Sequence, residues 1–194
     1  MNAAQLSDDE LLGRSREPIV QPRRVTPFDL VLLDRDGTLN VHRPGYICAP
    51  DELVLLPGAA DAVRLLNEAG CPTVLITNQR GIATGELTWD QLLAVQRRLE
   101  RELAADRAHL DAVQLCPHQT GSCDCRKPLP GLLDQALARA PWARPDRCVM
   151  IGDQPTDVSP AEHRGMHGIR IRQDGTRLYD VVRDLLRPHR PRQP

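Results

Sequence analysis

The chain has 194 residues, of which 41% are apolar and 26% charged, a balance typical of one globular domain with a substantial core. The formal net charge of -1 offers no basic excess, so we expect no nucleic-acid partner. No apolar run reaches the roughly 18 residues that a membrane helix needs, so we expect no membrane partner either. We also expect the protein to be a monomer.

Residues 1–27 are predicted to be an extension that precedes the main domain. The sequence Ser7-Asp8-Asp9-Glu10 has the form of a capping box, which predicts a short helix over 8–14, and three prolines then keep the chain extended. The extension contains no group with an evident chemical role. We expect its charges to form a solvated face, and a partner-binding arm is the alternative.

An apolar run over 30–33 predicts a strand buried on both faces, and it ends in Asp34 and Asp36. In an open α/β sheet the ligand binds beyond the carboxyl ends of the strands, so both carboxylates stand where chemistry is expected. Asp34 could attack a phosphorus atom as a covalent nucleophile. Asp36 could protonate the leaving oxygen and then activate water. The alternative is an ordinary turn, because Gly37 follows.

A loop is predicted over residues 41–57, directly after the two carboxylates. It carries His42 and Arg43, which are either surface residues or, if the loop arches over the acids, contacts for an anionic substrate. A helix is predicted to follow over 59–69, because apolar residues recur there at helical spacing, and Gly70 ends it.

A second buried strand is predicted over 71–76. It leads into Thr77 and Asn78, and Gly81 and Gly85 behind them are expected to expose backbone N–H groups. A hydroxyl, an amide and free N–H groups at a strand end predict a seat for phosphate oxygens. A plain polar turn has the same composition and is the alternative.

The sequence predicts an amphipathic helix over 88–107, with Arg and Glu paired on its outer face. It also predicts a third strand over 111–115, which leads into a cluster of metal-ligand residues. Its members are Cys116, His118, Cys123 and Cys125. Three thiolates and one imidazole meet the requirement of a closed tetrahedral zinc site, which favours a structural role. A redox thiol cluster and metal-free cysteines are the alternatives. Reduced thiols and the lack of an apolar signal segment at the start predict a cytoplasmic location.

Arg126 and Lys127 follow this cluster, which would hold both cations rigidly. A lysine beside Asp34 would orient the nucleophile and offset phosphate charge, and an arginine can grip an anion through two parallel hydrogen bonds. An exposed pair of charges is the alternative.

Two further carboxylates, Asp153 and Asp157, follow a fourth predicted strand. Magnesium takes one or two carboxylates together with phosphate and water. Asp34 and Asp153, with the backbone carbonyl of Asp36, could supply these ligands. Asp157 fits better as a residue that orients them.

The remaining predicted elements are helices over 130–140 and 176–186 and strands over 147–151 and 168–171. Strands that alternate with helices predict an α/β fold with a parallel sheet. We divide the chain into the extension over 1–27, a main domain over 28–187 and a disordered tail over 188–194.

Four motifs together resemble those of the haloacid dehalogenase-like phosphatases. They are Asp34-x-Asp36-Gly37-Thr38, Thr77-Asn78-Gln79, Lys127, and Gly152-Asp153-x-x-Thr156-Asp157. The cysteine loop that runs into Arg126 and Lys127 narrows the resemblance to the zinc-loop subgroup, which contains heptose bisphosphate phosphatases and histidinol-phosphatases.

This resemblance implies a Rossmann-like three-layer sandwich with a central, mostly parallel sheet and a zinc-binding loop. It implies magnesium and zinc as cofactors and an aspartyl-phosphate intermediate. Asp34 would be the nucleophile, Asp36 the acid/base and Asp153 a magnesium ligand. Thr77 and Lys127 would hold the transferred phosphoryl group.

The resemblance also implies that Arg126 contacts the substrate. The spacing of the motifs leaves no room for a separate cap domain, so loops must select the size of the substrate. Arg80 stands where the subgroup usually has a small hydroxyl residue, and Gln154 where the heptose enzymes usually have a lysine. The positive charge that is missing at Gln154 and the one that is gained at Arg80 could replace each other beside a distal phosphate of the substrate. They could equally mark a different phosphorylated sugar. The stretch between His118 and Cys123 is also shorter than in typical heptose enzymes.

The expected substrate is therefore a small phosphorylated metabolite, first of all D-glycero-D-manno-heptose 1,7-bisphosphate. Histidinol phosphate or another sugar phosphate is the alternative. An inactive zinc-bearing interaction module is a hypothesis of a different class, and the complete set of motif residues stands against it. A polynucleotide-end phosphatase would need a basic, aromatic groove, for which one Phe, two Tyr and two Trp offer little material.

Overall fold

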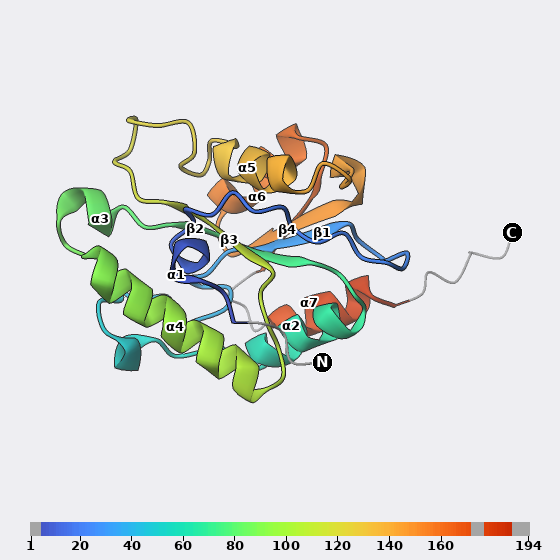
Figure 1. The fold of residues 1–194 in the computed structure, drawn as a ribbon, viewed down its shortest axis with the longest axis horizontal. Coiled ribbons are helices and arrows are strands. Elements are labelled where there is room, and N and C mark those ends of the chain that lie inside the picture. The colour runs from blue at the N-terminus through green and yellow to red at the C-terminus, as the bar shows by residue number, and fades with distance from the viewer. Residues whose placement is uncertain (1–4, 172–176, 188–194) are drawn as a thin grey trace, which may run out of the picture.

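The computed structural model describes residues 5–171 and 177–187. At its centre the described residues form a sheet of five strands, all parallel, in the order β3-β2-β1-β4-β5 (Figure 1). The strands are β1 (Leu30–Leu33), β2 (Thr73–Asn78), β3 (Ala112–Cys116), β4 (Cys148–Gly152) and β5 (His167–Arg170). The predicted α/β class with a parallel sheet is confirmed.

Helices cover both faces of the sheet, so the fold has three layers (Figure 1). The α-helices are α1 (Asp8–Leu11), α2 (Ala59–Glu68), α3 (Gly81–Thr84), α4 (Trp89–Ala105), α5 (Gly131–Arg139), α6 (Pro155–His163) and α7 (Leu178–Leu185). Short 3-10 helices are η1 (Pro50–Glu52) and η2 (Pro145–Arg147). Helices α2, α4 and α7 pack on one face, and α5 and α6 pack on the other. No separate domain interrupts the order of these elements over the described residues, as the spacing of the motifs predicts.

The apolar run of β1 divides between the two cores. Leu30 and Leu32 belong to the cluster under α5 and α6, whereas Val31 and Leu33 belong to the cluster under α2, α4 and α7. Successive residues of a strand point to opposite faces, so a strand that is covered on both sides has to be apolar at every position. This explains the uninterrupted run from which the strand was predicted.

The register of the sheet brings the strand ends to one edge. Leu33 pairs with Leu75 of β2 and with Ile151 of β4. Because the strands are parallel, the residues that follow β1 lie between the last residues of β2 on one side and the residues that follow β4 on the other. At the outer end of the same edge, Asn78 of β2 pairs with Cys116 of β3.

Several elements differ from the prediction. The predicted helix over 8–14 ends at Leu11, and the predicted loop over 41–57 contains η1. β2 extends to Asn78, so Thr77 and Asn78 belong to the strand. The expected open loop at 81–85 is the single-turn helix α3, and the N–H groups of Ile82, Thr84 and Gly85 are bonded within this turn. Helix α6 was not predicted, because a proline inside it and a weak amphipathic pattern conceal it. Residue 176 of the predicted last helix and the predicted tail over 188–194 lie outside the described residues.

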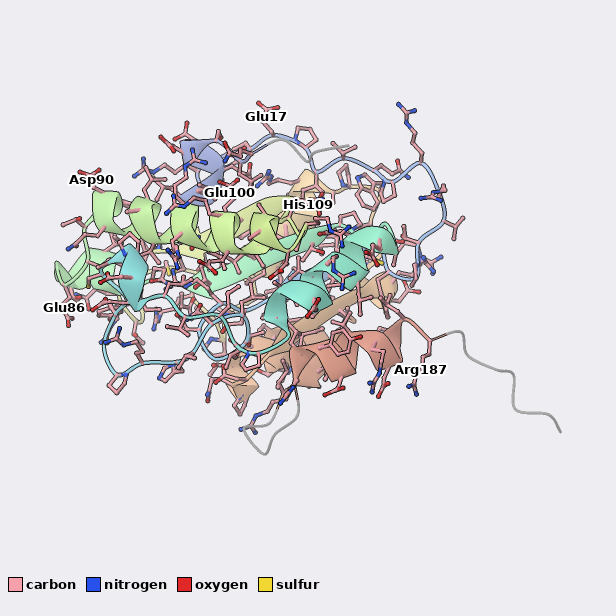
Figure 2. All side chains as sticks on the ribbon, turned by 90° about the horizontal axis from the view of Figure 1, so that it is seen from below. Glu17, Glu86, Asp90, Glu100, His109 and Arg187 are labelled. Carbon is pink, nitrogen blue, oxygen red and sulfur yellow. The ribbon has the colours of Figure 1, made fainter. Side chains whose placement is uncertain are left out.

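The outer face of α4 carries the expected ion pairs, which join Arg97 to Glu100 at 3.0 Å and Arg98 to Glu102 at 2.6 Å. Figure 2 shows this helix along its length, with Asp90 in its first turn and Glu100 farther along. Within the described parts of the chain, no helix combines the length and the hydrophobicity that crossing a membrane requires.

The N-terminal extension packs into the fold. Leu11 and Ile19 are buried in the two cores, and Glu10 forms a buried ion pair with Arg139 of α5. The same carboxylate accepts the N–H of Val113 in β3, at the edge of the sheet. The expectation of a solvated charged face is therefore wrong for Glu10. The division of the chain at residue 27 stays a prediction.

Candidate active site and cysteine cluster

The carboxyl edge of the sheet borders a cavity of about 450 Å³. The predicted site residues that line it are Asp34, Asp36, His42, Arg43, Thr77, Asn78, Arg126, Lys127, Asp153 and Asp157. They come from the ends of β1, β2 and β4, from the loop after β1 and from the chain after the cysteines. The fold thus gathers residues that are far apart in the sequence around one space.

Lys127 is the centre of a buried charged group beneath this cavity. Its Nζ lies 2.6 Å from Oδ1 of Asp34 and 2.7 Å from Oδ1 of Asp157, and it donates to the carbonyl of Ile76 at 2.8 Å. Burial raises the pKa of Asp34 to about 7, Asp157 and Asp36 add to the rise, and Lys127 opposes it. Burial by itself would lower the pKa of Lys127, but the two carboxylates outweigh it and raise the pKa, which keeps the ammonium charged.

Three carboxylates meet at this point with oxygen atoms within 4.8 Å of one another: those of Asp34, Asp153 and Asp157. Asp153 keeps a buried Oδ1 that has no hydrogen-bond partner among the described residues. Three acids against one lysine leave an excess of negative charge, and oxygen donors of this kind suit magnesium. The donor set therefore fits a divalent cation beside Asp34 and Asp153.

Gly37 makes the approach of Asp153 possible. Its φ is +91°, and a Cβ at this position would lie 2.5 Å from Oδ2 of Asp153. Only glycine combines this left-handed conformation with the absence of a side chain. The turn after β1 is thus shaped to admit a carboxylate from the end of β4.

Asp36 is held by several donors. Arg35 binds it through Nε and Nη2, Asn40 donates to Oδ1 at 3.0 Å, and Gln79 donates to Oδ2 at 3.2 Å. Burial alone would raise the pKa of Asp36, but the charge of Arg35 and these hydrogen bonds outweigh it, so the pKa lies below its usual value. The carboxylate is held in place while one side of it faces the cavity.

The polar groups at the end of β2 have distinct tasks. Asn78 exchanges two hydrogen bonds of 3.1 Å with the backbone of Lys127, so its amide fixes the lysine to the strand. The Thr77 hydroxyl accepts from Gln79 at 2.9 Å, which leaves its own hydrogen for a ligand. Nη1 of Arg126 is buried without a partner among the described residues. Thr77 and Arg126 therefore retain donors for an anion, whereas both ends of the Asn78 amide are engaged.

The loop after β1 forms the outer wall of the cavity. His42, Arg43 and Tyr46 line it, and Arg43 lies 3.7 Å from Glu52. Arg80 does not line the cavity. Its Nε donates to the Tyr46 hydroxyl at 3.1 Å, so it meets the site only through that side chain.

The four predicted metal ligands beside β3 come together in space. Sγ of Cys116 lies 3.6 Å from that of Cys123, and Sγ of Cys125 lies 3.4 Å from that of Cys123 and 3.2 Å from Nδ1 of His118. Zn–S bonds of about 2.3 Å in a tetrahedron place sulfur atoms about 3.8 Å apart, close to this arrangement. Burial and the neighbouring thiols raise the pKa of Cys125, so a cation is needed to hold it as a thiolate. The cluster fits a metal ion that four protein ligands enclose.

Arg35, Gln79 and Tyr46 also line the cavity, but sequence reasoning assigned no role to any of them. Arg35 stands between two carboxylates directly after a buried strand, and Gln79 follows two polar residues at the end of β2. Their proximity to the motif was a usable signal, although it does not show where the side chains point.

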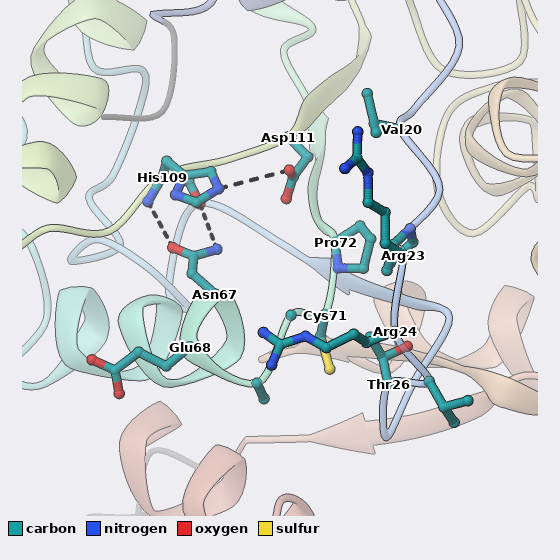
Figure 3. Close-up of a pocket in the computed structure, with 14 residues that line it drawn as sticks. Val20, Arg23, Arg24, Thr26, Asn67, Glu68, Cys71, Pro72, His109 and Asp111 are labelled. Atoms are coloured by element: carbon teal, nitrogen blue, oxygen red, sulfur yellow. Dashed lines mark hydrogen bonds and ion pairs between the residues drawn. The ribbon is translucent and has the colours of Figure 1, made fainter. Parts of the chain in front are cut away.

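A second cavity of about 410 Å³ lies at the opposite, amino edge of the sheet (Figure 3). Asn67 and His109 exchange two hydrogen bonds there, and Nε2 of His109 lies 3.7 Å from Oδ1 of Asp111 (Figure 3). Because these polar groups satisfy one another, we place the chemistry at the carboxyl edge.

The fold and the paired carboxylates at the carboxyl end of β1 define a hydrolase site of a known type. The family model described as haloacid dehalogenase-like hydrolase matches residues 39–165. The match spans more than half of the chain, and the chain belongs to the haloacid dehalogenase-like hydrolases.

Two relatives and one solved structure illustrate the likeness. D-glycero-beta-D-manno-heptose-1,7-bisphosphate 7-phosphatase of Haemophilus influenzae is 38% identical over 135 residues, which are 66% of this chain and 72% of that protein. D-glycero-alpha-D-manno-heptose-1,7-bisphosphate 7-phosphatase of Mycobacterium tuberculosis is 35% identical over 135 residues, 69% and 71% of the two chains. The crystal structure of D,D-heptose 1,7-bisphosphate phosphatase from B. bronchiseptica, complexed with magnesium and phosphate, matches with a TM-score of 0.74 and 32% identity, over 81% of this chain and 98% of that chain. The predicted family, the three-layer fold and a phosphatase activity are confirmed.

Proposed function

We propose that this phosphatase hydrolyses D-glycero-D-manno-heptose 1,7-bisphosphate in a magnesium-dependent reaction that passes through an aspartyl phosphate on Asp34. The observation that carries the proposal is the ion pair of 2.6 Å between Asp34 and Lys127, buried below a cavity into which Asp36 also faces. A nucleophile, an acid/base and a fixed cation thus surround one reacting centre.

In the first half of the reaction an oxygen of Asp34 attacks the phosphorus atom. The P–O bond to the sugar breaks, and the proton of Asp36 passes to the leaving oxygen. This step requires Asp36 to be protonated beside the bound substrate, although Arg35 and its hydrogen bonds lower its pKa in the free protein. Lys127 and the free hydrogen of Thr77 stabilise the charge on the phosphoryl oxygens. The sugar leaves as an alcohol, and the phosphoryl group stays on Asp34.

In the second half, water attacks the same phosphorus atom. Asp36 takes a proton from this water, the bond between phosphorus and Asp34 breaks, and inorganic phosphate leaves. Asp34 is again a carboxylate and Asp36 is again protonated, so the cycle closes with one water consumed.

Two metal ions belong to the proposal. Asp34, Asp153 and the backbone carbonyl of Asp36 would hold magnesium, which neutralises phosphate charge and orients the substrate when bound. The cluster of Cys116, His118, Cys123 and Cys125 would hold zinc, which stabilises the loop before Arg126 and Lys127.

The substrate is inferred from the cavity rim and from the relatives. His42, Arg43 and Arg126 line the cavity and can face the second phosphate of a bisphosphate. Relatives named for the α and for the β anomer match at similar identity, so both anomers of the bisphosphate belong in the substrate test. The loops themselves set the size limit, since over the described residues no lid domain covers the cavity.

The test is phosphate release from heptose 1,7-bisphosphate, histidinol phosphate and other sugar mono- and bisphosphates, each with magnesium and with chelator. We expect magnesium-dependent turnover that favours the heptose bisphosphate. Asp34→Asn should abolish turnover while circular dichroism shows an unchanged fold. A preference for histidinol phosphate would overturn the substrate, turnover by Asp34→Asn would overturn the covalent mechanism, and a folded, zinc-loaded wild type that releases no phosphate would favour a binding module.

A further inference from the structure

Arg35, between the two catalytic carboxylates in the sequence, has a guanidinium that is almost completely buried, with a side-chain exposure of 1%. Asp36 is the carboxylate paired with it among the described residues. Nη2 lies 3.0 Å from Oδ2 and 3.2 Å from Oδ1, and Nε lies 3.2 Å from Oδ2. This forked contact fixes both the position and the plane of the carboxylate.

The other side of the guanidinium is fixed by a second buried group. Nη1 of Arg35 donates to Oε1 of Gln96 at 3.3 Å, and Nε2 of Gln96 donates to the carbonyl of Leu11 at 3.2 Å. Gln96 lies on α4 and is 1% exposed, and Leu11 ends α1 of the N-terminal extension. A continuous line of hydrogen bonds, buried as far as Arg35 and partly buried at Asp36, therefore runs from the extension to Asp36.

A buried guanidinium must keep its anionic partner, because an unpaired charge inside a protein is strongly unfavourable. Asp36 therefore stays paired with Arg35, and its position follows the position in which Gln96 holds the guanidinium. The Asp36 side chain is 28% exposed, so its free side is turned toward the cavity.

We propose that Arg35 is a positioning residue for the acid/base Asp36, and that Gln96, anchored on α1, sets the position of Arg35. The inference rests on the proposed function, because it requires Asp36 to act as the acid/base. It assigns to the carbonyl of Leu11, at the end of α1, a part in holding Gln96 in place.

The decisive variant is Gln96→Glu, which is almost the same size as the native side chain and adds a second carboxylate beside Arg35. This carboxylate competes with Asp36 for the guanidinium. We expect kcat, measured on the phosphate ester that the wild type hydrolyses best, to fall by about tenfold or more. The inhibition constant of inorganic phosphate should stay within about twofold, because the phosphate contacts are intact.

Arg35→Met and Arg35→Lys extend the test. We expect Arg35→Met to lose at least as much kcat as Gln96→Glu, and Arg35→Lys to recover part of it, because a lysine supplies the charge without the fork. Arg97→Met is the matched control. Arg97 binds the carbonyl of Leu6 at 2.6 Å and so holds the same extension to α4 without contacting Arg35. Its kcat should equal that of the wild type.

A kcat within twofold of the wild type in folded Gln96→Glu would overturn the inference, and so would an equal loss of kcat in Arg97→Met. The variant Asp36→Asn in the same assay separates this result from the proposed function. If Asp36→Asn is inactive while Gln96→Glu is fully active, only the positioning role fails. If Asp36→Asn retains full kcat, the acid/base assignment itself fails.

Discussion

The ion pair between Glu10 and Arg139 makes a sharp prediction about the N-terminal extension. Nη1 and Nη2 of Arg139 each donate to one oxygen of Glu10 at 2.8 Å, and the two side chains are 5% and 8% exposed, respectively. Oε1 of Glu10 also accepts the N–H of Val113 at 3.0 Å. The change Glu10→Leu keeps a side chain of similar volume but leaves a buried cation and a buried N–H without this partner.

Removal of one member of a buried pair costs about 3 to 5 kcal/mol, because the remaining charge is left uncompensated. For a chain of this length each kcal/mol corresponds to about 2 to 4 °C in Tm, so Glu10→Leu should lower Tm by roughly 6 to 20 °C. The double variant Glu10→Leu/Arg139→Met removes both charges. It should recover most of the loss and lie within about 2 kcal/mol of the wild type, since an apolar pair can replace a buried ion pair.

The assay is urea unfolding followed by circular dichroism, with metals at fixed concentration. Arg164 and Asp134 provide a matched control, because they form a pair with the same two distances of 2.8 Å but are 43% and 44% exposed. Asp134→Ala should leave the midpoint within the error of measurement. A free energy of unfolding for Glu10→Leu within about 1 kcal/mol of the wild type would refute the reasoning, as would a double variant that is no more stable than the single one.

Two further variants test the metal sites. Gly37→Ala should raise the magnesium concentration needed for half-maximal activity by about tenfold or more, because the new Cβ would lie 2.5 Å from Asp153. The control is Gly45→Ala, which should not change this concentration, because Gly45 has a similar positive φ but no atom within 4 Å of the added Cβ. Equal effects in both variants would point to backbone strain alone. Cys123→Ser should lower the bound zinc and the Tm before it alters kcat. The control Cys48→Ser lies outside the cluster and should keep its zinc. Loss of zinc at an unchanged Tm would contradict a structural role.

The parts of the site that follow a strand directly could be predicted from the sequence. Asp34 and Asp153 each come after a short apolar run, and Thr77 lies at the end of another. In a parallel sheet the carboxyl ends of the strands meet at one edge, independent of the conformation of the loops. The local sequence pattern was therefore sufficient to predict that these residues come together. The structure brings these residues together around the cavity at the carboxyl edge of the sheet, and their chemical roles remain proposals.

The parts that depend on distant partners could not be predicted. Glu10 and Arg139 are 129 residues apart, and nothing in the pattern of residues 7–14 distinguishes a buried acid from a solvated one. Arg35 stands between two charged residues, which is typical of an exposed segment. Its burial depends on Gln96, which is 61 residues away in the sequence. Helix α6 was concealed by Pro160. For Glu10 and Arg35 the missing information was tertiary contact, which overrides local propensity.

The contacts of Lys127 determine how loss of the proposed zinc should reach the active site. Asn78 pairs in register with Cys116, and its amide binds the backbone of Lys127, so the cysteine loop is fastened to β2 at both ends. The ammonium of Lys127 also keeps its bonds to Asp34 and Asp157, which do not pass through the loop. Nη1 of Arg126 is buried and has no such attachment to the part of the chain that the structure describes. A loosened loop should therefore first raise KM, through Arg126, while kcat is maintained by Lys127.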